Sequence, residues 1–228
     1  MSEWAESQYH QKYAWKDSEG NITEEWGDTA KRVVTNVMGA LDYSEDSPEV
    51  QELIQMVSDR EFMPGGRYLY ASGREMHQVQ NCLLMKAEDS REGWAELGHN
   101  ALMALQTGAG IGIDYSEVRP AGSPIRKTGG VASGPIPLMN IINEIGRGVM
   151  QGGARRSAIW AGLQWDHPDC LEFIHIKDWS PEIRALKEKD FNFPAPMEFT
   201  NVSILLNDEF FEAYEDESHE KHELANKI

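Results

Sequence analysis

Residues 81–115 read NCLLMKAEDSREGWAELGHNALMALQTGAGIGIDY. Two short apolar runs, CLLM and GIGIDY, stand on either side of a stretch from Arg91 to Gln106 whose pattern predicts a helix. The alternation continues with a helix predicted over Leu138 to Met150 and a further apolar run, SAIWAGL. Strands that alternate with helices are typical of parallel sheets with crossover connections. The sequence therefore predicts an α/β fold.

The chain before this segment has a different pattern. Apolar residues recur at spacings of three and four over Trp26 to Leu41 and over Pro48 to Val57, with Asp and Ser in capping positions. This pattern is typical of helices. We expect a helical N-terminal region over residues 1–62.

The chain after this segment adds one more strand and ends in acid-rich sequence. NVSILL, from Asn201 to Leu206, predicts a strand, and Asp208 begins an acidic helix. Three prolines between Trp179 and Phe199 predict a long surface connection. We expect residues 63–228 to form the α/β part of the chain.

The overall composition excludes several classes of protein. The chain has 228 residues, 40% of them hydrophobic, and a formal net charge of -17. No apolar run approaches the roughly 20 residues that cross a membrane, and the polar start is unlike a signal peptide, so we expect a cytoplasmic protein. Such acidity argues against a nucleic-acid polymer as partner. A small nucleotide in a local basic pocket stays possible.

One segment of this acidic chain is basic and rich in glycine. Residues 119–156 carry six Lys or Arg, a single acid, Glu144, and eight of the twenty glycines. Clustered cations repel one another unless an anion lies among them. Glycine lets backbone amides approach a phosphate, and arginine grips it with a planar fork of donors. The segment therefore predicts an anion site.

Two loops of this segment, 122–130 and 150–158, carry most of its charge. Taken singly, their cations could equally be solvated loop charges, but as a group among glycines they favour phosphate contact. Neither loop is a Walker A sequence, and TGAGIG precedes a strand rather than following one, so it is no dinucleotide fingerprint. The cations are Arg126, Lys127, Arg155 and Arg156.

The two cysteines differ in their surroundings. Cys82 begins a predicted strand beside Asn81, after the glycine-rich MPGGRYLYASGR, which favours a reactive thiol at a pocket over a small core residue. Cys170 shares an apolar helical stripe with Phe173, so we expect it in the core. Two cysteines give no disulfide framework. His167 has no partners at metal-ligand spacing, so no metal site is predicted.

Five motifs taken together resemble the large catalytic subunit of ribonucleotide reductase. They are MPGGRYLYASGR, NCLLMKAEDSREGW, TGAGIGIDYSEVRPAGSPIRKTGGVASGPIPLM, MQGGARRSAIWAGLQWDHPDCLEFI and FTNVSILLNDEFFEA, in the family's order. The closest likeness is to the class II, adenosylcobalamin-dependent branch. The resemblance implies a ten-stranded α/β barrel that reduces ribonucleotides to deoxyribonucleotides. In that family a cysteinyl radical abstracts the 3′ hydrogen, and two other cysteines supply electrons by forming a disulfide.

The resemblance also implies roles for single residues. Cys82 matches the first of the two reducing cysteines, on the first barrel strand. The positions that match the substrate pocket are Gly65, Gly66, Arg67, Asn81 and Gly110.

The basic loops match the family's regulatory elements. Asp89 matches the acid that holds the ribose of a deoxynucleoside triphosphate effector, with Arg119, Arg126 and Lys127 near its phosphates. Gln151 and Arg155 match the second specificity loop, between effector and substrate base. A loop that contacts both ligands would couple their affinities.

The family's radical cysteine, its neighbouring Asn and Glu, and its second reducing cysteine have no counterparts here. The resemblance therefore implies an N-terminal half with about five barrel strands, incomplete as an enzyme by itself. Its partners would be a ribonucleotide, the other half of the barrel, a thioredoxin-like reductant and, in dimeric relatives, a second copy. Two alternatives stay open, a non-catalytic deoxynucleotide-binding fragment and part of a class I large subunit.

Overall fold

The computed structural model describes residues 2–75, 78–126, 128–149 and 157–228. Its internal contacts divide the chain into two compact units, Met1–Asn81 and Cys82–Ile228. The boundary expected from the sequence lies earlier, between residues 62 and 63. Within the described ranges, no helix combines the length and apolar character needed to cross a membrane.

The first unit is helical. Helices α2 and α3 pack through a small apolar cluster, in which Ala30 and Val34 of α2 meet Val50 and Val57 of α3. The Asp28 carboxylate accepts a hydrogen bond of 2.9 Å from the Glu25 amide and so caps the start of α2. The helices of this unit are α1 (Glu3–Lys12), α2 (Trp26–Gly39), α3 (Pro48–Asp59) and α4 (Gly66–Ala71).

Arg32 of α2 forms a mostly buried ion pair with Glu24 and also reaches α4. The Arg32 guanidinium donates to both carboxylate oxygens of Glu24, at 2.8 and 2.7 Å, and to the backbone carbonyls of Leu69 and Ser72. Burial raises the pKa of Glu24, but hydrogen bonds from Arg32 and its neighbours outweigh that effect and hold the pKa below its usual value. One arginine thus satisfies an acid and two carbonyls at the end of α4.

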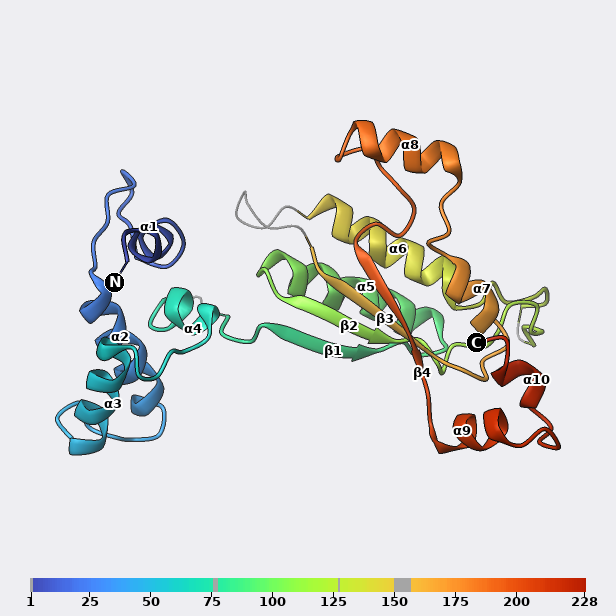
Figure 1. Ribbon diagram of the computed structural model, residues 1–228, viewed down its shortest axis with the longest axis horizontal. Coiled ribbons are helices and arrows are strands. Elements are labelled where there is room, and N and C mark those ends of the chain that lie inside the picture. Colours follow the sequence, from blue (N-terminus) through green and yellow to red (C-terminus); the bar gives the residue numbers. More distant parts are fainter. Residues whose placement is uncertain (1, 76–77, 127, 150–156) are drawn as a thin grey trace. The chain divides into compact units, whose positions relative to one another are not determined.

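The second unit is built on a four-stranded parallel sheet in the order β1-β2-β3-β4 (Figure 1). Parallel neighbours need crossover connections, and here each crossover contains a helix. The sequence therefore predicts the α/β class correctly. The strands are β1 (Cys82–Lys86), β2 (Gly110–Asp114), β3 (Ile159–Gln164) and β4 (Thr200–Leu205).

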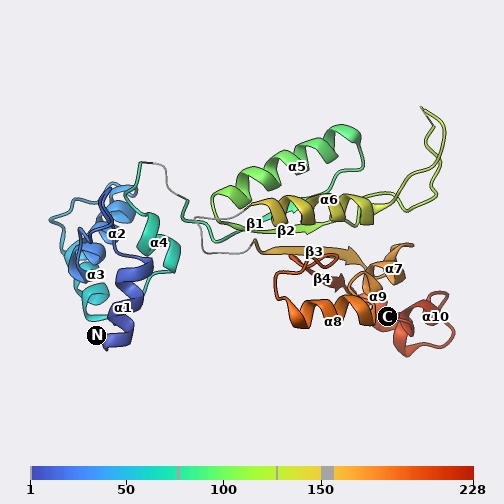
Figure 2. The ribbon, with the colours of Figure 1, turned by 90° about the horizontal axis from the view of Figure 1, so that it is seen from above.

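One face of this sheet is covered by helices. Helices α5 (Arg91–Gln106) and α6 (Pro135–Gly148) run side by side over it (Figure 2), and α7 (Cys170–His175) packs against β3 and β4. Alternate strand residues, such as Ile111 and Ile113, are buried beneath them. The intervening residues form the opposite face, which we call the open face; it carries Cys82, Leu84, Gly110, Gly112, Trp160 and Gly162.

The described part of the chain has four strands, whereas about five were expected. After β4 the chain forms α9 (Asp208–Glu215) and α10 (His222–Ala225), which pack around the buried Trp165. The predicted surface connection before β4 contains α8 (Pro181–Lys189), whose start is capped by Ser180 and whose residues are not buried. Proline at the first helical position favours such a start.

Candidate functional site

A pocket of about 410 Å³ lies beyond the carboxyl ends of β1 and β2. Its walls come from three stretches: the turn between β1 and α5, the segment that follows β2, and the residues that lead into α6. Cavities of this size hold small ligands in many proteins. We call it the carboxyl-end pocket.

Two predicted effector residues meet at this pocket. Arg119 Nε donates to Asp89 Oδ2 over 2.6 Å, although the two residues are 30 positions apart. Both line the pocket, with side chains 40% and 31% exposed. Such partly exposed pairs contribute at most about 1 kcal/mol to stability, but a ligand can reach them. The remaining guanidinium donors of Arg119 suit a phosphate or a carboxylate.

A short hairpin carries Arg126 beside this pocket. Pro124 and Val131 form an isolated antiparallel bridge, and the Gly122 amide donates to the Ala132 carbonyl over 2.9 Å. Ile125, the residue before Arg126, lines the pocket together with Val131. Arg126 itself is exposed. Lys127, predicted to act with it, lies outside the described residues.

The open face carries the predicted reducing cysteine. Cys82 is exposed and lies opposite Gly110 in the β1–β2 register. A Cβ on Gly110 would lie 3.6 Å from Cys82 Sγ and 3.5 Å from the Ala158 carbonyl oxygen. The thiol therefore stands directly beside a backbone without a side chain, which leaves room for a ligand to approach.

Sequence reasoning missed Trp160 on the same face. Its indole lies against Gly112 and Gly162, and its Nε1 donates to Ser203 Oγ over 2.9 Å. A Cβ on Gly112 would lie 3.2 Å from the indole, and one on Gly162 would overlap it. The sequence did offer a signal: Gly110 and Gly112 alternate in GIGID, and Gly162 stands two residues after Trp160. Because alternate residues of a strand share one face, this pattern indicates a face with room for a large side chain.

The other predicted substrate residues belong to the first unit. Gly65 is the N-cap of α4, and Asn81 Nδ2 is 3.9 Å from where a Cβ of Gly65 would lie. A Cβ on Gly66 would lie 3.1 Å from Tyr13 Cε1, so close packing against Tyr13 accounts for this glycine. Arg67 lies on α4. Gln151 and Arg155, predicted for the second specificity loop, fall outside the described residues.

Cys170 is a core residue, as predicted. It is the first residue of α7 and is fully buried, as is Phe173 of the same helix. Burial, aided by the charge of Asp166, raises the pKa of its thiol to about 11. A thiol in this state is a poor nucleophile and a poor electron donor at neutral pH.

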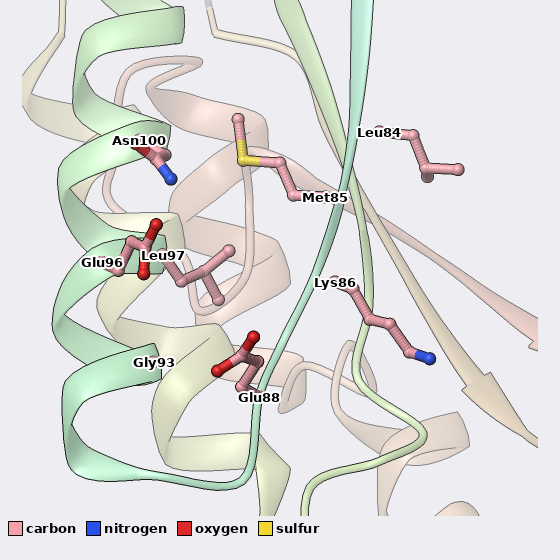
Figure 3. A pocket seen from close by; sticks show the side chains of 8 residues that line it. All are labelled: Leu84, Met85, Lys86, Glu88, Gly93, Glu96, Leu97 and Asn100. Atoms are coloured by element: carbon pink, nitrogen blue, oxygen red, sulfur yellow. The ribbon is translucent and has the colours of Figure 1, made fainter.

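A second pocket, of about 290 Å³, lies between β1 and α5. In Figure 3 Met85, Leu97 and Glu88 turn toward the space between strand and helix. Gly93 allows this arrangement, since a Cβ there would lie 2.6 Å from Glu88 Cβ. No three His, Cys, Asp or Glu side chains in the described ranges are grouped so that they could hold a metal ion.

Comparison with known proteins agrees with the motifs. A family model described as "Ribonucleotide reductase, barrel domain" matches residues 80–226. The chain is 29% identical over 209 residues to a protein of Mycobacterium tuberculosis named "Vitamin B12-dependent ribonucleoside-diphosphate reductase", covering 90% of this chain and 28% of that protein. A protein of the same name from Thermoplasma acidophilum is 30% identical over 165 residues, covering 72% of this chain and 20% of the relative.

A relative with a different name matches over a similar length. The Schizosaccharomyces pombe "Ribonucleoside-diphosphate reductase large chain" is 26% identical over 235 residues, covering 92% of this chain and 28% of the relative. The chain thus spans less than a third of the length of these relatives. Because the family model matches well over half of its residues, this chain belongs to the ribonucleotide reductase barrel-domain family.

Proposed function

We propose that this chain forms part of a ribonucleotide reductase that converts ribonucleotides to deoxyribonucleotides, with regulation through the carboxyl-end pocket. One observation carries the proposal: Asp89 and Arg119, from two separate motifs, are joined by a 2.6 Å hydrogen bond at the rim of a ligand-sized pocket. The fold places Asp89 and Arg119 next to each other, and the family resemblance implies that both contact the same effector nucleotide.

The proposed ligand of this pocket is a deoxynucleoside triphosphate. The Asp89 carboxylate is an acceptor that suits a sugar hydroxyl, and Arg119 retains donors for phosphate oxygens. Arg126 stands exposed on the adjoining hairpin, where it can reach a triphosphate that extends from the pocket. Lys127 is proposed to act with it.

At the open face, Cys82 is proposed as one of two reducing thiols. In the net reaction two thiols give up two electrons and two protons and become a disulfide. The ribonucleotide loses its 2′ hydroxyl as water and gains a hydrogen in its place. Cys82 is exposed beside Gly110, so a second sulfur and a substrate can both approach it. The second cysteine and the radical cysteine must come from outside this chain, since Cys170 is buried.

The remaining predicted residues keep proposed roles in substrate binding and coupling. Gly110 of the second unit is proposed to contact the substrate, and Gly65, Gly66, Arg67 and Asn81 keep the substrate-binding roles that the family resemblance implies. Gln151 and Arg155 are proposed to relay the identity of the effector to the substrate site, as the family resemblance implies.

Adenosylcobalamin is proposed for the complete protein, because two relatives carry vitamin B12 in their names. When bound, this cofactor supplies the radical.

The proposed partners follow from the same chemistry. A disulfide formed at Cys82 must be reduced after each turnover, which requires a thioredoxin-like dithiol.

In the described part of the sheet, β1 and β4 each pair on one side only, and such edges suit the strands of the other half of a barrel. The relatives' names favour a ribonucleoside diphosphate as substrate. A homodimer is also proposed.

A second candidate function is a deoxynucleotide-binding module without catalysis. The buried Cys170 favours it, because only one of the chain's two cysteines is accessible, and a disulfide needs two. Isothermal titration of the chain with dATP and dTTP tests the binding that both candidates share. Deoxynucleotide formation, after the rest of the barrel is added, separates them. If that activity requires a second radical-generating subunit instead of cobalamin, the class I alternative is correct.

A further inference from the structure

His167 and Asp169 lie on the turn between β3 and α7, outside the set of residues that line either pocket. Their side chains are only 6% and 11% exposed. Buried polar groups cost free energy unless they are hydrogen-bonded, so the contacts of these two side chains show what they hold in place.

His167 reaches the segment that follows β2. The Asp169 amide donates to His167 Nδ1 over 3.1 Å, so Nδ1 is an acceptor and the ring hydrogen lies on Nε2. Nε2 then donates to the Val118 carbonyl over 2.8 Å. One tautomer satisfies both contacts, and it fixes the position of Val118 relative to the turn.

Asp169 reaches the other end of the same segment. It is the N-cap residue of α7, where an aspartate usually accepts a hydrogen bond from its own helix, yet it makes no such bond. Instead, Asp169 Oδ2 accepts from the Ala121 amide over 2.9 Å. The carboxylate is thus directed away from its own helix and toward the loop.

The same carboxylate also lies against the start of α6. Gly134, the N-cap residue of α6, has a φ of +77° and lines the carboxyl-end pocket. A Cβ on Gly134 would lie 2.6 Å from Asp169 Oδ2 and 2.9 Å from the Ala121 nitrogen. Asp169 therefore occupies the space that a side chain at position 134 would need.

These contacts enclose Arg119, which lies between the two anchored positions, Val118 and Ala121. We infer that His167 and Asp169 are positioning residues of the carboxyl-end pocket. They hold the loop at both ends against the start of α6 and so direct Arg119 toward Asp89. This inference rests on the proposed function of the pocket, because it assigns these residues a part in nucleotide binding without contact to the nucleotide.

The test compares Asp169→Ala, Asp169→Asn and Asp178→Ala in the 228-residue chain. Asp178 is the matched control, because it forms a 2.7 Å contact with His175 near the end of α7, within its own segment. Titration with dATP and dTTP should show about tenfold weaker binding for Asp169→Ala, as expected when a hydrogen bond to a charged group is lost. Asp169→Asn keeps an acceptor oxygen and should recover most of the affinity, and Asp178→Ala should bind like the unmodified chain.

The NMR signal of the Arg119 Nε–H group provides a readout without nucleotide. Asp169→Ala should shift or broaden it, and Asp169→Asn should not. If Asp169→Ala does not fold, His167→Phe, which keeps a ring of similar volume but loses the donor to Val118, takes its place. Unchanged affinity in a chain that binds deoxynucleotides would overturn the inference. If the unmodified chain binds neither nucleotide, the proposed function of the pocket fails, and an unchanged Arg119 signal would then overturn the positioning role separately.

Discussion

The carboxyl-end pocket and the open face belong to the same sheet but are built in opposite ways. At the pocket, polar side chains bond to one another and to backbone, as Arg119 does with Asp89 and Asp169 does with Ala121. At the open face, the thiol of Cys82 stands beside Gly110, and the indole of Trp160 lies against Gly112 and Gly162. The pocket has its polar partners within this chain, whereas the open face offers space and one reactive group.

This contrast determines where each proposed activity can be measured. A ligand site whose walls and ion pair come from one chain can bind by itself. A thiol that must form a disulfide needs a second sulfur within bonding distance. Binding should therefore be separable from chemistry, and substitutions and labelling at the pocket, at the open face and in the core test the contrast between the two sites.

The largest effect is expected from Cys82→Ser in the protein that contains the whole barrel. Loss of a reducing thiol should lower deoxynucleotide formation by at least about a thousandfold, because the disulfide that supplies the two electrons cannot form without it. Deoxynucleotide binding to the pocket should not change. Cys170→Ala is the control and should retain turnover, since Cys170 is buried in the core. Comparable losses in both variants would remove the distinction between the two cysteines.

Alkylation of the folded chain by iodoacetamide should distinguish the two thiols strongly. Burial raises the pKa of Cys170 from 9.0 to about 11, so at pH 8 it holds about a hundredfold less thiolate than an ordinary cysteine. Cys82 is exposed and should be labelled first. Because Cys170 stays protonated below its pKa, its labelling should increase as the pH rises toward 11 or when the chain is unfolded. Peptide mass spectrometry reads both sites, and equal labelling at pH 8 would contradict the prediction.

Arg119→Ala should weaken deoxynucleotide binding by about ten- to a hundredfold, the range expected for a lost charged hydrogen bond. Titration calorimetry measures this change. Lys189→Ala, which removes one positive charge from the exposed α8, serves as the control and should bind normally. An equal loss in both variants would mean that overall charge, and not the pocket, controls affinity.

The smallest effects concern the glycines of the open face. Gly162→Ala should cost about 1–3 kcal/mol in the free energy of unfolding, because its Cβ would overlap the Trp160 indole. Adding Trp160→Leu should recover part of this loss. Gly110→Ala should change stability little, since its Cβ would meet no atom closer than 3.5 Å. Urea unfolding measures all three, and an equal cost at Gly110 and Gly162 would show that overlap with the Trp160 indole does not set the cost at Gly162.

Much of the second unit could be predicted from the sequence. The helix expected over Arg91 to Gln106 is present with those bounds, and β1 begins at Cys82 as expected. These predictions succeeded because periodicity and strand-forming runs are local properties. The helix expected to begin at Asp208 is present as α9, and the described residues form the four strands expected from the sequence, whereas the family resemblance implied about five.

The functional residues divide in a similar way. The glycine and arginine content of residues 119–156 by itself predicted an anion site, and family motifs named Asp89, Arg119 and Cys82, since composition and motif order are written in the chain. The ion pair across 30 positions, the indole over two glycines and the reach of Asp169 to Ala121 emerged only from the folded chain. The physical reason is that these contacts depend on which strands are neighbours and which way loops turn. Long-range packing sets both, and no local spacing encodes them.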